Sequence, residues 1–112
     1  MSCLFCKIAA GEIPATVVYQ DATCLAFVDI DPRSPVHLLI IPRRHIGSLA
    51  TVESADEPLL GHLLWVAANL AAKKDLAEGF RVVMNTGMDG GQTVAHLHLH
   101  LLGGRAMHWP PG

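Results

Sequence analysis

The chain has 112 residues, of which 51% are hydrophobic, and eight Lys and Arg against ten Asp and Glu leave a formal net charge of −2. This size suits one domain with a real core, so we expect a single domain over residues 1–112. The charge balance argues against a nucleic-acid binder, which usually carries a basic stripe, and no apolar run reaches the roughly 18 to 20 residues of a membrane span.

The N-terminal segment MSCLFCKIAAGEIP lacks the basic and long apolar regions of a secretory signal. Three cysteines, an odd number, do not indicate a disulfide framework. We therefore expect a cytoplasmic protein that binds neither nucleic acid nor membranes. Within this segment, residues 3–9 predict a short helix that Gly11 and Pro14 end.

Three strands are predicted next. The segments TVVYQ (16–20) and CLAFVDI (24–30), separated by Asp21-Ala22-Thr23, predict a hairpin. The segment DPRSP (31–35) predicts a turn, because proline cannot serve a central ladder. The segment VHLLIIP (36–42) is apolar on both faces, which is typical of a covered central strand.

A long helix is predicted after these strands. Ser54, followed three residues later by Glu57, forms a capping-box signature. Leucines and alanines then recur at helical spacing to about residue 77. Gly79 supplies the stop signal.

Two strands complete the predicted fold. They are FRVVMN (80–85) and AHLHLHLL (95–102), joined by the glycine-rich loop TGMDGGQT (86–93). The order is helix, three strands, helix, two strands. It predicts an α+β fold in which one short and one long helix pack on a mainly antiparallel sheet of about five strands.

Three histidines stand at spacing two in the last predicted strand. His96, His98 and His100 would share one face, while the leucines between them would face the core. A solvated polar face, a metal site that uses some of the three, and catalysis are the alternatives. Catalysis is favoured because imidazole can act as a nucleophile or proton carrier at neutral pH.

The loop before these histidines also favours catalysis. In the segment DGGQT (89–93), the glycines can present successive backbone N–H groups as an anion-binding nest. Gln92 and Thr93 add side-chain donors, and Asn85 lies at the end of the preceding strand. A phosphate held there would face the first histidines of the strand.

The segment HLHLHLL (96–102) resembles the His-φ-His-φ-His-φ-φ signature of the histidine-triad (HIT) nucleotide-binding proteins, where φ is apolar. The resemblance covers nearly the whole chain, including residues 4–46. The segment GGQTVAHLHLHLLGGRAMHWPPG (90–112) is similar to the Hint branch rather than to the fragile-histidine-triad branch. The resemblance implies a HIT-like fold, a sheet shared across a homodimer, and a purine nucleoside monophosphate site at the triad.

The resemblance also implies residue roles. His98 resembles the nucleophile that takes up the nucleotidyl group, His100 resembles a phosphate contact, and His96 and His37 resemble the rest of a proton-relay cluster. Asp29 resembles the carboxylate that holds both ribose hydroxyls. The positions similar to phosphate-binding residues are Asn85, Gly91, Gln92 and Thr93. The positions similar to the walls of the base pocket, for which plain core is the alternative, are Leu4, Phe5, Ile8, Phe27, Ile30 and Leu39.

The implied activity is hydrolysis of purine nucleoside phosphoramidates, such as adenosine 5′-monophosphoramidate, to AMP and an amine. It proceeds through a nucleotidyl-histidine intermediate, and no cofactor is required for catalysis. Two alternatives stay open. One is a dinucleoside polyphosphate hydrolase or nucleotidyl transferase, and the other is a nucleotide-binding interaction protein whose hydrolysis is incidental.

Two cysteines raise the question of a structural metal. Cys3 and Cys6 have the C-x-x-C spacing of a zinc half-site. The chain resembles family members of a zinc-bound type, in which histidines matching His45 and His96 complete the four ligands. Two thiols on a short helix without metal are the alternative.

The chain ends with RAMHWPPG (105–112). Burying Trp109 would remove a large apolar surface from water. In the Hint branch this segment reaches across the dimer toward the partner's active site. The resemblance therefore implies that Trp109 shapes the leaving-group side of the other subunit's pocket.

Overall fold

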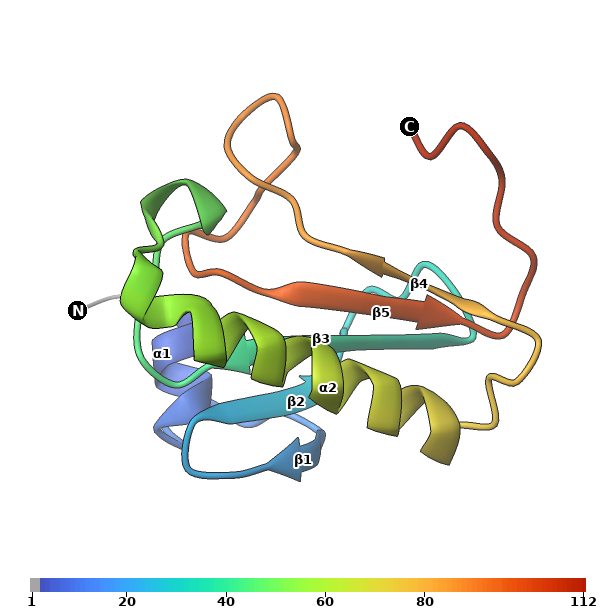
Figure 1. The fold of residues 1–112 in the computed structure, drawn as a ribbon. Coiled ribbons are helices and arrows are strands. Elements are labelled where there is room, and N and C mark those ends of the chain that lie inside the picture. The colour runs from blue at the N-terminus through green and yellow to red at the C-terminus, as the bar shows by residue number, and fades with distance from the viewer. Residues whose placement is uncertain (1–2) are drawn as a thin grey trace.

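The computed structural model describes residues 3–112, so Met1 and Ser2, which the single-domain prediction includes, lie outside the described residues. Five strands form one sheet in the order β1-β2-β3-β5-β4, and all neighbours are antiparallel (Figure 1). The predicted α+β architecture is confirmed. The strands are β1 (Val17–Gln20), β2 (Cys24–Val28), β3 (Val36–Pro42), β4 (Phe80–Val83) and β5 (Leu99–Gly103).

The two helices, α1 (Leu4–Ala9) and α2 (Glu57–Lys73), cover opposite faces of the sheet (Figure 1). Side chains alternate along a strand, so each central strand of the sheet contributes side chains to both faces. Leu38 and Ile40 of β3 pack on the α2 side, and Leu39 packs on the α1 side. Cover on both faces explains why β3 has apolar side chains on both faces, as its sequence predicted.

The hairpin between β1 and β2 is also confirmed, and Asp21 forms it. The carboxylate oxygen Oδ1 of Asp21 accepts hydrogen bonds from the backbone N–H groups of Thr23 and Cys24. Strand β2 ends two residues earlier than predicted. The backbone N–H of Asp29 still donates to the carbonyl of His37 at 3.0 Å, and its Oδ1 accepts from the N–H of Asp31 at 2.8 Å, which starts the turn.

The start of the long helix differs from the prediction. Ser54 lies in a short 3-10 turn (Ser54–Asp56), and α2 begins at Glu57. Asp56 is the N-cap residue of α2 in place of Ser54, but its side chain makes no hydrogen bond into the helix; it accepts from the backbone N–H of Glu53 and pairs with Arg44. The helix ends at Lys73, four residues before the predicted end.

The last strand starts later than predicted, at Leu99 instead of residue 95. The N–H of Leu97 donates to the carbonyl of Ile46 at 2.7 Å, so this part of the chain is held by a loop and not by a strand. The predicted facing is nevertheless confirmed, because Leu97, Leu99 and Leu101 are all buried in the α2-side core. Strand β4 is likewise shorter than predicted and ends at Val83.

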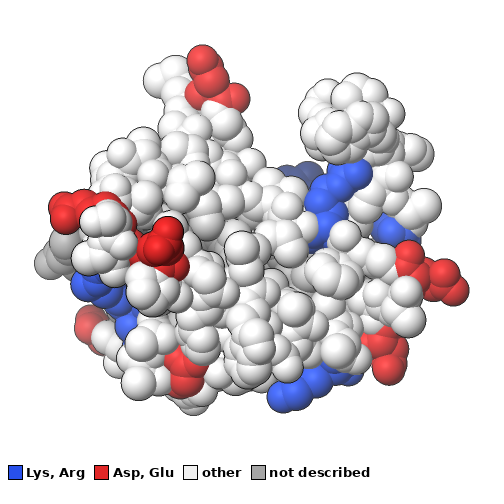
Figure 2. All heavy atoms as spheres, viewed as in Figure 1, with Lys and Arg blue, Asp and Glu red and all other residues white. Residues whose placement is uncertain are grey.

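Charge is spread thinly over the face shown in Figure 2. Acidic and basic side chains are scattered there over a mostly uncharged surface, with basic side chains below the C-terminal tail. Within the described part of the chain, neither helix has the length and apolar character needed to cross a bilayer.

Candidate active site

His98 has one ring nitrogen fixed by the backbone. Its Nδ1 lies 2.7 Å from the carbonyl oxygen of His96. A carbonyl can only accept, so we infer that the proton of the neutral imidazole is on Nδ1 and that Nε2 holds the lone pair. The ring of Phe5 packs edge-on against this imidazole, with centroids 5.1 Å apart. An oriented Nε2 lone pair is what a nucleophilic histidine requires.

His37 and His100 form a second, linked pair. The backbone N–H of Arg33 donates to Nδ1 of His37 at 3.0 Å, which leaves the proton of His37 on Nε2. This Nε2 lies 2.9 Å from Nδ1 of His100 and 3.3 Å from a carboxylate oxygen of Asp29. His100 accepts at Nδ1, so its own proton is on Nε2. The two rings therefore form a directed chain of N–H donors.

Both imidazoles of this pair are neutral near pH 7. Burial lowers the pKa of His37, although the nearby carboxylate of Asp29 opposes this effect. Burial also lowers the pKa of His100, and repulsion from His98 and His37 contributes, bringing it to about 4. A neutral His100 can donate from Nε2 and accept at Nδ1 at the same time.

A cavity of about 270 Å³ opens beside His98 and His100 on the α1 side of the sheet. Thr93 and Asp29 also line it, as do all the residues predicted to form the base pocket: Leu4, Phe5, Ile8, Phe27, Ile30 and Leu39. Phe5, Phe27 and Leu39 are at the same time core residues. The sequence did not indicate five further lining residues, Ile13, Pro14, Ala15, Val28 and Val94, because only the fold brings them here.

The glycine-rich loop differs from the predicted anion nest. The N–H groups of Gly91 and Gln92 donate to the carbonyls of Met88 and Gly87 within the loop. The side chain of Gln92 is also engaged, because its amide nitrogen donates to the carbonyls of Gly47 and Val94. Gln92 thus fixes the loop, and its role as a phosphate donor stays a prediction that would require these hydrogen bonds to be exchanged. Neither Asn85, Gly91 nor Gln92 lines the cavity.

His96 faces away from the cavity. Its Nε2 lies 2.8 Å from the carbonyl oxygen of Pro42, so the lone pair is on Nδ1. That Nδ1 lies 3.4 Å from Sγ of Cys3 and 3.5 Å from Sγ of Cys6. Both ring nitrogens are engaged outside the cavity, so the proton-relay role of His96 stays a prediction that these contacts do not support.

The cysteines, His96 and His45 bring four donor atoms together. Nδ1 of His45 lies 3.2 Å from Sγ of Cys6, and all four donors lie within 4.8 Å of one another. Bonds of about 2.0 to 2.3 Å in a tetrahedral zinc site would place ligand atoms roughly 3.3 to 3.8 Å apart. Two sulfurs and a histidine lone pair aimed at them therefore fit a zinc ion. Burial and the neighbouring Cys3 raise the pKa of the Cys6 thiol.

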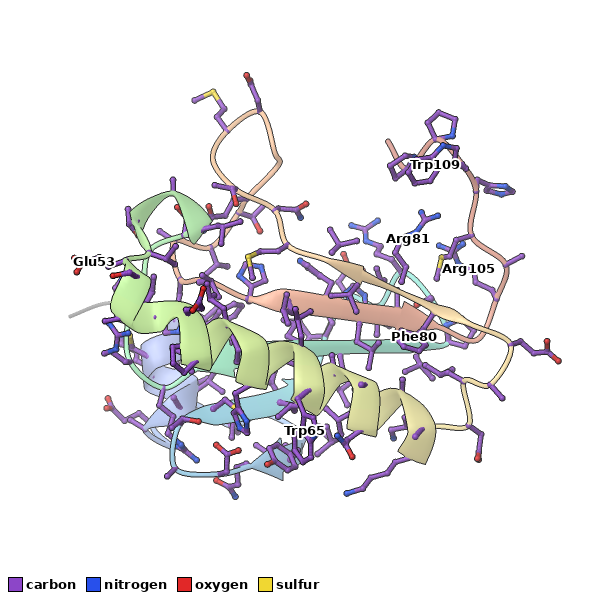
Figure 3. The ribbon with its side chains drawn as sticks, in the orientation of Figure 1. Glu53, Trp65, Phe80, Arg81, Arg105 and Trp109 are labelled. Atoms are coloured by element: carbon purple, nitrogen blue, oxygen red, sulfur yellow. The ribbon has the colours of Figure 1, made fainter. Side chains whose placement is uncertain are left out.

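The C-terminal tail lies apart from these sites. Trp109 is 82% exposed and points away from the sheet (Figure 3). A hollow of about 560 Å³ between the tail and β4 is larger than the cavity at His98 but is lined by none of the triad histidines. Trp109 does not line the cavity of its own chain, and its predicted role at the other subunit's pocket stays a prediction.

Comparison with known proteins agrees with this geometry. The sequence model of the HIT domain family matches residues 10–107. An uncharacterized HIT-like protein of Synechococcus elongatus is 53% identical over 109 residues, which are 97% of this chain and 96% of the relative.

Two solved structures extend the comparison. A HIT family hydrolase from Legionella pneumophila Philadelphia 1 has a TM-score of 0.98 and 55% identity, with 99% of this chain and 100% of that chain covered. A histidine triad nucleotide-binding protein from Candida albicans has a TM-score of 0.83 and 34% identity, with 97% and 83% covered. From its fold, its triad and these matches, the chain belongs to the HIT domain family.

Proposed function

We propose that the protein hydrolyses purine nucleoside phosphoramidates to a nucleoside monophosphate and an amine, as a member of the Hint branch. The observation that supports this proposal most is the pairing of an unprotonated Nε2 on His98 with an N–H donor on His100 at the same cavity. Nucleophile and acid are the two groups that cleavage of a P–N bond needs. The solved HIT family hydrolase supports the broader assignment to hydrolysis.

In the first step, Nε2 of His98 attacks phosphorus and forms a P–N bond as the bond to the leaving amine breaks. The electron pair of that bond goes to the amine nitrogen, which takes a proton from Nε2 of His100. A proton from the solvent replaces the one that His100 gives up, while Nε2–H of His37, 2.9 Å away, keeps Nδ1 of His100 hydrogen-bonded, so both rings stay neutral. Proton transfer of this kind contributes about 10² to 10⁴ in rate.

In the second step, water attacks the nucleotidyl-His98 and releases a proton to the solvent. The P–N bond to His98 breaks, and its electron pair restores the lone pair on Nε2. During both steps, Nδ1–H of His98 remains on the carbonyl of His96, so the ring keeps one orientation. Fixed geometry of this kind supports attack at the short, near in-line distance that phosphorus requires.

The nucleotide would lie across the cavity. The apolar walls suit a purine base, and the half-buried carboxylate of Asp29 suits the ribose hydroxyls. One oxygen of Asp29 accepts from the N–H of Asp31, which holds the carboxylate in place. Thr93 lines the cavity near the triad and can donate its hydroxyl to phosphate. Asn85 and Gly91 stay proposed phosphate positions that would require the loop to move toward the ligand.

Trapping tests the nucleophile. With a slowly hydrolysed phosphoramidate, the native protein should give one nucleotidyl adduct per chain, located on His98 by mass spectrometry. His98→Ala should abolish turnover and leave AMP affinity within about an order of magnitude, because it removes a bond-forming atom and not the base pocket. His62→Ala, on α2 and outside the cavity, is the matched control and should retain activity. An adduct on another residue, or turnover that a chelator stops without any adduct, would contradict the assignment.

A substrate panel tests the class of substrate. The proposal expects kcat/KM for adenosine 5′-monophosphoramidate to exceed that for diadenosine polyphosphates. The reverse order would favour a polyphosphate hydrolase or nucleotidyl transferase that uses the same His98.

We also propose that Cys3, Cys6, His45 and His96 hold a structural zinc ion, which would supply charge and rigidity at the base of α1 and no catalytic step. The support is the four-donor geometry. His96 would link this site to the active site, since its ring faces the cysteines and its carbonyl orients His98.

Finally, we propose that two chains form a homodimer. Strand β4 lies at one edge of the sheet, where its outer N–H and C=O groups are available to a second chain. Pairing there would continue the sheet across the dimer. Sedimentation equilibrium should then give twice the chain mass, and a monomer at micromolar concentration would contradict the proposal.

A further inference from the structure

The segment that follows β5 packs directly on the turn that precedes β3. Gly104 has a φ of +91°, and a Cβ added to it would lie only 2.9 Å from the side chain of Pro35. Glycine is therefore required for the two segments to approach this closely. As a result, the next residue, Arg105, lies against the turn at Arg33.

Arg105 uses its guanidinium to hold this turn. Its Nε and Nη2 lie 3.3 Å and 3.1 Å from the carbonyl oxygen of Arg33, and its Nη1 donates to the carbonyl of Ala106. Two donors on one carbonyl fix both the position and the direction of that carbonyl. Arg33 is also the residue whose N–H donates to Nδ1 of His37.

We propose that Arg105 is a positioning residue for the proton pathway. By holding Arg33, it keeps the Arg33 N–H on Nδ1 of His37, and so keeps the proton of His37 on Nε2, where it faces His100. The catalytic consequence rests on the proposed function, since it assumes that His100, held by Nε2–H of His37, donates a proton. The structural part, the choice of tautomer at His37, does not depend on any substrate.

Ser34 stabilises the turn from within through a hydrogen bond to the carbonyl of Val36, and Arg105 supplies the contact to the Arg33 carbonyl from another segment. The side chain of Arg33 forms an ion pair with Asp31 in which both side chains are about three-quarters exposed, and exposed pairs contribute little. If Arg33 shifts, His37 loses the donor at Nδ1 and can carry its proton on either nitrogen. A His37 with its proton on Nδ1 would place two lone pairs face to face, at its Nε2 and at Nδ1 of His100, and the donor chain would break.

The chain provides a matched control. Arg81 also donates from Nη2 to a backbone carbonyl, that of His108, at 2.7 Å. Both arginines lie in the region between the sheet and the C-terminal tail (Figure 3). Arg81, however, has no contact with the turn at Arg33 among the hydrogen bonds described for residues 3–112. Arg105→Met and Arg81→Met therefore remove comparable contacts that differ in their connection to His37.

The experiment measures the ring ¹⁵N shifts of His37 in the substrate-free protein, which distinguish the two neutral tautomers. The native protein and Arg81→Met should show a single Nε2–H tautomer, and Arg105→Met should show a mixture. Arg105→Met should also lower kcat for a phosphoramidate about tenfold, within the range for proton transfer, with KM changed less than twofold. Arg105→Lys, which keeps one cationic donor, should restore part of both effects.

Three results would overturn the proposal: an unchanged Nε2–H tautomer in Arg105→Met, the same mixture in Arg81→Met, or a fall in kcat without a change of tautomer. If Arg105→Met is too unstable to study, Arg105→Lys still provides the comparison, because no intermediate shift there would also count against the proposal. Absence of phosphoramidase activity in the native protein would contradict the proposed function alone, since the tautomer is read without substrate.

Discussion

The three triad histidines are equally spaced in the sequence, but each has a different partner in the structure. Nδ1 of His98 meets a backbone carbonyl, Nδ1 of His100 meets the ring of His37, and Nδ1 of His96 meets two sulfurs. The partner decides which nitrogen carries the proton, and the proton decides the chemistry. Identical residues at identical spacing thus acquire distinct roles from their surroundings.

The lowered pKa of His100 predicts a pH dependence of stability. The folded protein binds a proton at His100 only near pH 4, against an ordinary value of 6.5. Below pH 6.5 the unfolded chain binds more protons, so the free energy of unfolding falls as pH drops toward 4 and is unaffected by His100 above 6.5. The groups facing His100 are His98, His37 and Asp29, of which only Asp29 opposes the shift.

Urea unfolding between pH 7.5 and 4.5 measures this dependence. We expect the loss of stability below pH 6.5 to be smaller in His100→Asn, which keeps a polar side chain and does not titrate. The difference should be on the order of 2 kcal/mol at the acid end. Parallel curves for the two proteins would show that His100 titrates normally.

Asp21 should matter for stability and not for activity. Its carboxylate accepts from Tyr19 and His62, each at 2.7 Å, and from the backbone of the hairpin. Burial alone would raise its pKa, but these hydrogen bonds outweigh burial and hold the pKa well below its usual range. Asp21→Ala should lower the free energy of unfolding by about 2 to 3 kcal/mol, because several partly buried donors lose their acceptor.

Chemical denaturation and phosphoramidate kinetics check this prediction together. Asp89→Ala, in an exposed loop, is the control for loss of a carboxylate and should leave stability within about 0.5 kcal/mol. A fall in kcat in folded Asp21→Ala protein would contradict the separation between the hairpin and the site.

At the scale of elements, α1 is the smallest helix and the one most dependent on its surroundings. Its six residues are too few to form a stable helix alone. It is held by Phe5 in the α1-side core and by the cysteines beside His96. A metal at the cysteines would therefore determine how firmly α1 covers the cavity.

Elemental analysis and hydrogen exchange test this role of the cysteines. Protein purified without chelator should contain one zinc per chain. The Cys3→Ser, Cys6→Ser double variant should contain none, and the amides of α1 should exchange faster while those of β3 do not. Cys24→Ala, at a thiol buried in β2, should keep its zinc. Metal-free native protein would argue for the alternative of two free thiols.

The sequence predicts most accurately those helices, strands and turns that depend on residues only a few positions apart. The hairpin at Asp21 and the apolar strand β3 were placed correctly, because turn residues and hydrophobic runs act over a few positions. The start of β5 could not be placed. The segment before it is held by a hydrogen bond from Leu97 to Ile46, about 50 residues away along the chain, which no local pattern encodes.

At the candidate active site, too, some features follow from the sequence and others from contacts between distant segments. Family resemblance predicted the six apolar wall residues, Asp29, Thr93 and the two histidines that line the cavity, and it placed His96 beside the cysteines as a zinc ligand. It did not predict the engagement of Gln92 within its loop or the five further lining residues. Both depend on contacts between segments that only the folded chain brings together.

At the scale of the whole molecule, the tail provides a further test of the dimer. Trp109 is 82% exposed in one chain, so its burial requires a second copy. Deleting residues 107–112 should change the ratio of activities across amine leaving groups more than it changes Tm. Trp109→Ala should reproduce this change, and Trp65→Ala, at an exposed tryptophan of α2, should not. An unchanged activity ratio in the truncated protein would defeat the idea.

The sheet separates two sets of buried residues. The set on the α2 side is large and contains most of the core, whereas the set on the α1 side is small and also forms the cavity wall. Effects of substitutions that share no neighbours add independently. Proteins that evolve from this chain can therefore accumulate substitutions in the α1-side set and change their substrates, while the α2-side set keeps the fold stable. Substrate specificity and fold stability thus depend on residues on opposite faces of one sheet.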